Sequence, residues 1–295
     1  MNISPLFIMK SIDTLVKDIY DLFDPLVDVE LNEKEVDAHL DSFTESLKET
    51  LKNFLNEVPT DRRNLRLSAI GKPARQLWYG KNSKEKPQPL EPSTRVKFLY
   101  GHMLEDLLIL LSRLAGHTVT DLQKTVYVNG IKGHQDCVID DVLVDIKSAS
   151  ASAFKKFEEN TIHKDDPFGY IAQISAYAEA NNVDEAAFLA IDKSSGKICL
   201  TPIHSLGMIN AKERIDYLKG AMEQDNPPDR CYSDTPDGAS GNRKLAFGCF
   251  YCEHKRVCWA DKNEGKGLRV FNYANGNRFL TQVKKMPNVE EVTDW

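Results

Sequence analysis

The sequence HQDCVIDDVLVDIKS (134–148) contains two predicted buried β-strands that carry acidic side chains. Both strands are rich in Val, Ile and Leu, and Asp140–Asp141 predicts a tight turn between them. Strand side chains alternate between two faces, so Asp145 and Lys147 project side by side. Asp136, assigned to the first strand, lies near them if the strands pair. Burying a charge at a core position costs free energy unless the charge is paired or binds a metal. This segment therefore indicates an ion pair or a metal-binding site.

The periodicity of the flanking sequence predicts helices on both sides of these strands. The predicted helices cover residues 33–55, 95–115, 167–181 and 206–224. Further strands are predicted over 124–130 and on either side of a Ser-Ser-Gly turn within 186–203. Asn32 is the expected N-terminal cap of the first helix, and Gly116 is expected to end the second. Pro167 is expected in the first turn of the third helix. The proline-rich segment 81–93 is an expected loop. This order predicts an α/β fold with a mixed central β-sheet flanked by helices.

The composition allows one large domain with appendages. The chain has 295 residues, of which 41% are hydrophobic, enough to bury a sizeable core. We expect an acidic helical segment over 1–60, a core over 61–225 and a Cys-rich segment over 226–295 that packs on the core. No apolar run approaches the length of a membrane span and the start lacks a signal peptide pattern, which predicts a cytoplasmic protein with no membrane partner.

Charge is unevenly distributed along the chain. The net charge is −6, yet residues 61–97 hold 10 bases and 3 acids, while 1–60 hold 13 acids and 5 bases. The basic stretch is either a phosphate-binding surface or a solvated loop. Its candidate DNA contacts are Lys72, Arg75, Trp78 and Tyr79, although the two aromatic residues are equally consistent with core packing.

The acidic strands have a specific chemistry available to them. Two carboxylates on one sheet face form a hard-oxygen site that suits Mg²⁺ or Mn²⁺. A neighbouring Lys can hold a water or offset charge on a phosphorane-like transition state. These are the requirements of phosphodiester hydrolysis. The alternative is an Asp145–Lys147 salt pair on a solvated sheet face, because D-x-K is a common sequence.

The surrounding motifs favour the first alternative. In order, the chain contains Gly101 and Glu105 (G-x-x-x-E), GHQD ending at Asp136, D-x-K, and Gln173 with Tyr177 (Q-x-x-x-Y). Over roughly residues 65 to 275, this series resembles the PD-(D/E)XK nucleases of the RecB and lambda-exonuclease type. It is similar to podovirus exonucleases and to CRISPR-associated RecB-like exonucleases.

The resemblance implies a restriction-endonuclease-like core with a metal-binding catalytic site. The metal would be held by Glu105, Asp136, Asp145 and the carbonyl of Ile146. Lys147 would be the catalytic lysine, with Gln173 and Tyr177 supporting the site and the DNA strand. Many relatives have a His as the first ligand, which leaves His102 as an alternative to Glu105, the residue we favour.

Other polar residues near the motifs are weaker candidates. His134 could share a sheet face with Asp136, or merely line it. Ser148 and Ser150 could hold a phosphate or bond to the local backbone. Among the aromatic residues of SAFKKFEEN, Lys155 and Lys156 could contact a DNA strand or belong to a solvated helix face.

Four cysteines near the C-terminus predict a second metal centre. Cys249, Cys252 and Cys258 form a C-x2-C-x5-C series, and Cys231 lies 18 residues upstream. Four thiolates suit Zn²⁺ or an iron–sulfur cluster, with His254 as a possible substitute ligand. The remaining two, Cys137 and Cys199, are expected to be ordinary buried strand residues.

The cysteine tail resembles that of the iron–sulfur RecB-like nucleases. In that group a first cysteine precedes the nuclease core, at the place that Pro73–Ala74 occupies here. The departure leaves Cys231 as the natural fourth ligand and weakens the iron–sulfur interpretation. We favour a [4Fe–4S] cluster, with Zn²⁺ as the alternative.

These features together predict a metal-dependent DNA exonuclease. It is expected to be phage-encoded and to act on strand ends in DNA degradation, replication or recombination, with proteins of those processes as further partners. One alternative is a structure- or sequence-directed endonuclease, which would cut closed circular DNA. The other is a catalytically silent DNA-binding metalloprotein, against which the intact D-x-K pair argues.

Overall fold

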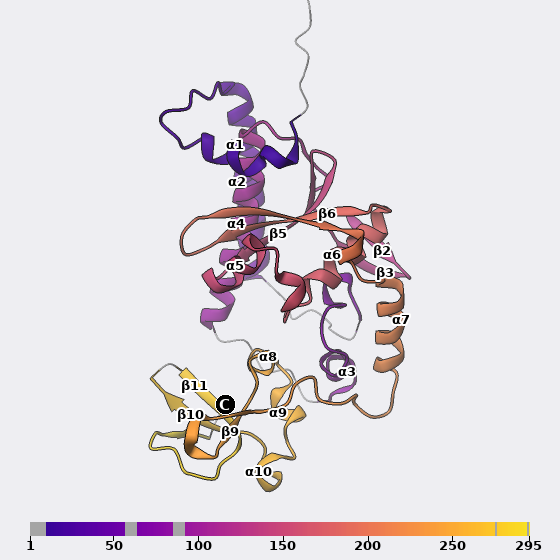
Figure 1. Cartoon of the computed structure of the whole chain (residues 1–295), viewed down its shortest axis with the longest axis vertical. Coiled ribbons are helices and arrows are strands. Elements are labelled where there is room, and N and C mark those ends of the chain that lie inside the picture. The colour runs from indigo at the N-terminus through magenta and orange to yellow at the C-terminus, as the bar shows by residue number, and fades with distance from the viewer. Residues whose placement is uncertain (1–9, 57–63, 85–91, 275, 294) are drawn as a thin grey trace, which may run out of the picture. The chain divides into compact units, whose positions relative to one another are not determined.

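The computed structural model describes residues 10–56, 64–84, 92–274, 276–293 and 295 (Figure 1). The described chain divides into two compact units. The first contains residues 10–56, 65–71 and 92–215, and the second contains residue 64, residues 72–84 and most of the chain from 216 onward. These units do not follow the three expected segments, because residues 72–84 group with the Cys-rich segment.

The first unit is built on a five-stranded mixed sheet, as the sequence predicts. The strand order is β1 (Val119–Thr120), β4 (Cys137–Ile139), β5 (Val142–Ala149), β6 (Glu185–Asp192) and β7 (Ile198–His204). Only β5 and β6 pair in parallel, and the other neighbours are antiparallel. The parallel pair requires a crossover, which α5 (Ala151–Glu158) and α6 (Tyr170–Asn181) provide.

Helices cover both faces of this sheet (Figure 1). On one face, α1 (Leu15–Asp21) and α4 (Pro92–Leu114) form an apolar core with the strands, in which Leu108 and Val144 are fully buried. On the other face, α5 and α6 pack on β5 and β6, and Phe157 meets Phe188 edge to face. Phe188 is the register partner of Asp145, so the acid lies on the α5–α6 face.

The acidic N-terminal segment contains the predicted helix. It is α2 (Glu33–Leu55), and the side chain of Asn32 accepts a hydrogen bond from the backbone N–H of Lys34, as expected of the cap. The helix packs on α4, where Ser46 donates to Asp106 at 2.8 Å. None of the described residues of α2 is buried, although the helix packs on α4.

The expected strand HQDCVID is wrong as a single element. Residues Ile131–His134 form β3, which pairs with β2 (Thr125–Val128) in a separate two-stranded sheet. The chain leaves that hairpin at Gln135–Asp136 before entering β4. His134 is therefore exposed in another sheet and does not share a face with Asp136.

Three helix boundaries also differ from expectation. Helix α6 begins at Tyr170 after Gly169, whose φ of +75° is left-handed, so Pro167 precedes the helix. Helix α7 (Ala211–Met222) begins later than expected because Ser205–Gly207 forms a 3₁₀ turn. The expected loop 81–93 is shorter, since α3 (Ala74–Asn82) and α4 enter it and residues 85–91 lie outside the described residues. The other 3₁₀ turns are Ile12–Thr14, Leu67–Ala69, Ile162–Lys164 and Gly238–Ser240.

The second unit contains a sheet that the sequence analysis did not predict. Its antiparallel strands lie in the order β12 (Glu291–Val292), β10 (Arg269–Tyr273), β11 (Gly276–Gln282), β9 (Arg243–Lys244) and β8 (Thr235–Pro236). The short helices are α8 (Phe247–Phe250), α9 (Lys255–Cys258) and α10 (Lys262–Gly265). A small core of Leu245, Cys249, Trp259 and Leu268 holds them together. No helix in the described part of the chain is long and apolar enough to cross a membrane.

Candidate active site

Strand β5 carries a buried carboxylate in contact with a lysine. Asp145 is 1% exposed, and the ammonium of Lys147 forms an ion pair with its Oδ2. Neither oxygen of Asp145 accepts a well-oriented hydrogen bond from any described residue. The expected Asp145–Lys147 pair is therefore present, but α6 covers that face of the sheet. The pair is buried, not solvated.

Asp136 is held against β5 although it lies outside any strand. Its Oδ2 accepts a hydrogen bond of 2.7 Å from the backbone N–H of Ile146. This bond ties the connection between β3 and β4 to strand β5. It holds the Asp136 carboxylate beside the Asp145–Lys147 pair. The prediction that Asp136 lies near these residues is confirmed. The contact is a side-chain hydrogen bond to the backbone of β5 and not a pairing of regular strands.

Glu105 points into the protein from α4, whereas His102 points outward. The side chain of Glu105 is 19% exposed and accepts a hydrogen bond of 2.8 Å from Nε2 of Gln123. His102 is 59% exposed, with Nδ1 3.8 Å from Oε2 of Glu105. Of the two alternatives, Glu105 is the one that faces the acids. Gly101, one turn before it, lies against the hydroxyl of Ser148 at the end of β5.

Gln173 and Tyr177 share one face of α6. Nε2 of Gln173 donates to the Tyr177 hydroxyl at 3.4 Å, and Tyr177 is fully buried. The Tyr177 ring lies against β3, where a Cβ built on Gly133 would come within 2.9 Å of it. Glycine in the GHQD motif thus lets the β2–β3 hairpin approach α6.

Burial and neighbouring acids raise the pKa of two carboxyls in this site. Burial is the main cause that raises the pKa of Asp136 well above its ordinary value, and Asp145 and Glu105 raise it further. Burial also raises the pKa of Asp145, against the opposing effect of Lys147. Burial lowers the pKa of Lys147, but Asp145 and Asp136 more than offset this and hold it above its ordinary value. Lys147 is therefore protonated at neutral pH.

Tyr170 is a site residue that the sequence analysis missed. The Lys147 ammonium lies 5.0 Å from the centre of its ring, within the range of a cation–π interaction. A signal was present, because residues 170, 173 and 177 follow helical spacing and project from one face of α6.

The other candidate DNA contacts are engaged locally. Lys155 pairs with Glu159 at 3.5 Å, and Lys156 pairs with Asp165 at 2.6 Å. The hydroxyl of Ser150 lies 3.3 Å from that of Ser152. Lys72, Arg75 and Trp78 belong to the second unit, and residues 61–63 of the basic stretch lie outside the described residues.

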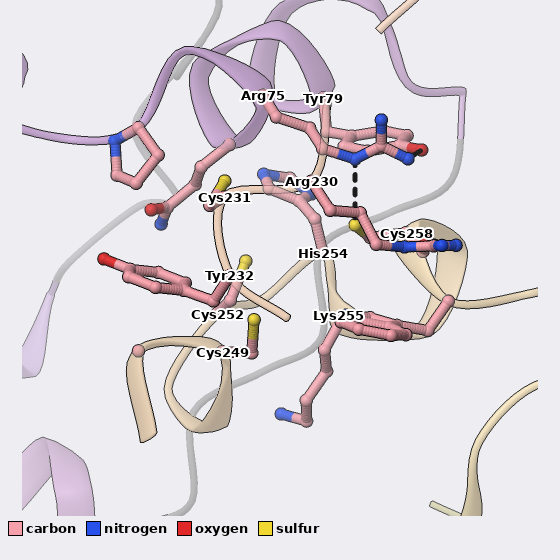
Figure 2. Close-up of a pocket in the computed structure, with 14 residues that line it drawn as sticks. Arg75, Tyr79, Arg230, Cys231, Tyr232, Cys249, Cys252, His254, Lys255 and Cys258 are labelled. Carbon is pink, nitrogen blue, oxygen red and sulfur yellow. Dashed lines mark hydrogen bonds between the residues drawn. The ribbon is translucent and has the colours of Figure 1, made fainter. Parts of the chain in front are cut away.

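The four candidate cysteine ligands line one pocket of the second unit (Figure 2). The sulfurs of Cys231, Cys249 and Cys252 point into a common space, whereas Cys258 faces Arg75. Burial raises the pKa of Cys249 to about 12 and that of Cys252 to about 11, and neighbouring thiols contribute to both shifts. The four cysteines thus line the same pocket although Cys231 is distant in sequence. His254 also lines the pocket, stacked on Tyr79.

Arg75 and Trp78 are anchored inside this unit. Nε of Arg75 donates to Sγ of Cys258 at 3.1 Å, Nη2 donates to the Tyr79 hydroxyl at 3.2 Å, and Nη1 donates to the carbonyl of Pro228. Nε1 of Trp78 donates to the carbonyl of Gln224 at 2.7 Å. These bonds position the Cys258 sulfur and hold α3 in place. Arg75 and Trp78 therefore stabilise the structure of this unit.

The two candidate metal sites have suitable donor atoms but are not preformed among the described residues. Among the described residues, no three Asp, Glu, His or Cys side chains are gathered into a group that could hold a metal. Both carboxylate oxygens of Asp145 are nevertheless buried and accept no well-oriented hydrogen bond from a described residue, and oxygen donors of this kind fit Mg²⁺ or Mn²⁺. The thiol pocket fits a soft metal by its donor chemistry. Both metal assignments stay predictions.

Comparisons with known proteins find only distant similarity. No family model and no curated protein matches the sequence. A crystal structure of SSO0001 is 17% identical, covers 73% of this chain and 95% of its own, and has a TM-score of 0.41. An alkaline exonuclease (LHK-Exo) from Laribacter hongkongensis is 15% identical over 55% of this chain and 91% of its own, with a TM-score of 0.35. A phage related exonuclease from Haemophilus somnus 129PT is 15% identical over 53% and 88%, with a TM-score of 0.37. Similarity at this level establishes neither a common fold nor a common function.

Proposed function

We propose that this chain is a metal-dependent deoxyribonuclease that hydrolyses DNA from strand ends. The observation that carries the proposal is the buried carboxylate of Asp145, which is paired with the ammonium of Lys147 but accepts no well-oriented hydrogen bond from a described residue. A buried ion pair contributes little to stability compared with apolar residues of the same volume. A fold that keeps one on a central strand therefore suggests a chemical use for it.

The residues that would hold the divalent cation are Glu105, Asp136, Asp145 and the carbonyl of Ile146. When bound, Mg²⁺ or Mn²⁺ would supply Lewis acidity and lower the pKa of a water molecule. The raised pKa values of the buried acids favour a cation at this place, because a nearby positive charge stabilises their ionised forms.

Lys147 would act as a fixed positive charge in the reaction. Its pKa is held above the ordinary value, so it does not accept the proton of an attacking water at neutral pH. Its ammonium would instead orient a water as a hydrogen-bond donor and stabilise negative charge on the phosphate. Gln173 and Tyr177 would support this arrangement through their hydrogen bond on α6.

Digestion of DNA is the direct test of this function. End-labelled single- and double-stranded DNA should be degraded with Mg²⁺ or Mn²⁺, while closed circular DNA stays intact. Asp145→Asn and Lys147→Ala should still bind DNA but cut at least about a hundredfold more slowly, the usual effect of such electrostatic groups. Asp141→Asn, at the exposed turn of the same β4–β5 hairpin, is the matched control and should keep the wild-type rate.

The outcomes separate the alternatives. Cleavage of the closed circle would favour an endonuclease. A protein that binds DNA but cuts none with either metal would favour the silent DNA-binding metalloprotein. Wild-type rates in both site variants would refute the nuclease assignment. The resemblance of the ordered motifs to RecB-type exonucleases is what favours attack from ends, and with it a phage-encoded role in DNA degradation, replication or recombination.

For the second unit we propose a structural metal centre held by Cys231, Cys249, Cys252 and Cys258. The proximity of four thiols around one pocket supports it, as does the bond from Arg75 to Cys258. A [4Fe–4S] cluster is favoured over Zn²⁺ by the resemblance of the cysteine series. Protein purified without oxygen should be brown, with iron on elemental analysis. Colourless protein with zinc would replace the cluster by Zn²⁺, and protein without either metal would refute the site.

A further inference from the structure

Phe168 is a large exposed aromatic residue that contacts the ring beside Lys147. It lies in the sequence DDPFGY before α6 and is 51% exposed. Its ring stacks on Tyr170, with 5.6 Å between ring centres and 29° between planes. Tyr170 in turn is the ring 5.0 Å from the Lys147 ammonium. Phe168 therefore stands one ring away from the residue that carries the site's positive charge.

The Tyr170 ring that links them is itself fixed. It packs against Phe157 at 6.0 Å and against Phe188 at 6.4 Å, both fully buried rings of the α5–α6 face. Phe168 is thus the outermost member of an aromatic row that begins in the core. One flank of its ring is occupied by Tyr170, while about half of the side chain stays open to solvent.

The backbone on both sides of Phe168 is held in place. The two carboxylate oxygens of Asp166 accept hydrogen bonds from the backbone N–H groups of Tyr170 at 2.9 Å and Ile171 at 2.8 Å. Gly169, with φ of +75°, packs so closely on Gly71 that a Cβ added to it would lie 2.3 Å from the Gly71 Cα. The turn thus presents the ring in a preset orientation and gives it little freedom to fold back.

A single exposed apolar side chain is ordinary on a protein surface. This one differs in combining a fixed backbone, a stacked neighbour and a nearby buried cation. A nucleotide offers the matching chemistry, since its phosphate is attracted to an ammonium and its base presents a flat π-face. Base stacking on aromatic residues tolerates any sequence, as a nuclease that degrades DNA progressively requires.

We propose that Phe168 is a stacking platform for the nucleobase adjacent to the phosphate that is cut. This inference rests on the proposed nuclease function and adds to it the residue that binds the terminal base. Lys147 would attract the phosphate, and the Phe168 ring would hold the attached base and so orient the strand end. Phe168 would then act on binding of the strand and not on the chemical step.

Fluorescence and kinetics on the full chain can test this platform. Single-stranded oligonucleotides with 2-aminopurine at the end should be quenched on binding to wild-type protein. Phe168→Ala and Phe168→Leu should lose that quenching and raise KM about 5- to 150-fold, the range for one stacked base, with kcat changed by no more than about threefold. Phe168→Tyr, which retains the π-face, should stay close to wild type.

The control is Phe23→Ala, which removes another exposed aromatic ring, 67% exposed, just after α1. It should leave quenching and KM unchanged. Wild-type KM and quenching in Phe168→Ala would overturn the platform, as would wild-type behaviour of Phe168→Leu, because a leucine has no π-face. A protein that shows Phe168-dependent quenching but cuts no DNA would support the platform and refute the nuclease function.

Discussion

Replacing Lys147 with Met tests whether its ammonium stabilises the folded state by compensating the buried carboxylates. Met is similar in length and uncharged, so Lys147→Met keeps apolar bulk beside Tyr170 while removing the cation that pairs with Asp145. The pKa values of Asp145 and Asp136 are already raised by burial, and Lys147 lowers both. Without it, ionised carboxylates remain buried with less compensation, and the folded state must lose stability.

The size of the loss follows from the burial of the pair. Removing one partner of a buried ion pair costs about 3–5 kcal/mol. Lys147 keeps slight exposure, which favours the lower end, about 3 kcal/mol near neutral pH. At ~2–4 °C per kcal/mol, the melting temperature of the first unit should fall by about 6–12 °C. The matched control is Lys156→Met, whose partner Asp165 is 69% exposed and which should cost less than about 1 kcal/mol.

The loss should also depend on pH with a definite sign. A carboxyl whose pKa is higher in the folded than in the unfolded protein destabilises the fold above the folded pKa, and this penalty disappears below the unfolded pKa. Removing Lys147 raises the folded pKa values further, so the gap between variant and wild type should widen as the pH rises from about 4, the ordinary carboxyl pKa, towards neutral. Thermal denaturation with a chelator over that range measures it. An equally stable variant, or a gap that is the same at every pH, would refute the reasoning.

Three further predictions follow from single contacts. Elemental analysis should find that Cys252→Ser loses the metal proposed for the second unit, while Cys199→Ser, in β7 of the first unit, retains it. His117→Ala should lower the free energy of unfolding by about 2–4 kcal/mol in denaturant, because the buried ring lies between two carboxylates at 2.5 and 3.2 Å. Gly169→Ala should lower the denaturation midpoint more than Gly196→Ala: both have φ near +75°, but only Gly169 would clash with backbone.

The sequence could predict those helices and strands that bury one face, because their apolar residues repeat at a regular spacing. Helices α2 and α4 and strand β5 follow their predicted ranges closely, because the apolar positions repeat at helical or strand spacing. The turn at Asp140–Asp141 was also predictable, and both residues have the positive φ that such short polar side chains tolerate. The placement of Asp145 and Lys147 on one face follows from the same alternation.

Other features depend on contacts that no local pattern encodes. The break at Gln135–Asp136 arises because β3 pairs with β2 and not with the main sheet, and a run of strand-forming residues does not show which partner it takes. The second sheet has strands as short as two residues, too short for a recognisable alternation. The contact between Arg75 and Cys258 joins positions 183 residues apart.

The features that cost stability gather around one place in the first unit. Asp145 and Lys147 are charged and largely buried on a central strand, and Phe168 is apolar and exposed just before α6. Each alone has an ordinary structural explanation, since buried pairs and exposed aromatic residues occur in many folds. Their convergence through Tyr170 is harder to explain by packing, because an apolar pair on β5 and a polar residue at 168 would stabilise the same backbone better. Local violations of folding preference are expected where a protein acts on a ligand, so this place is where we expect DNA to bind and react.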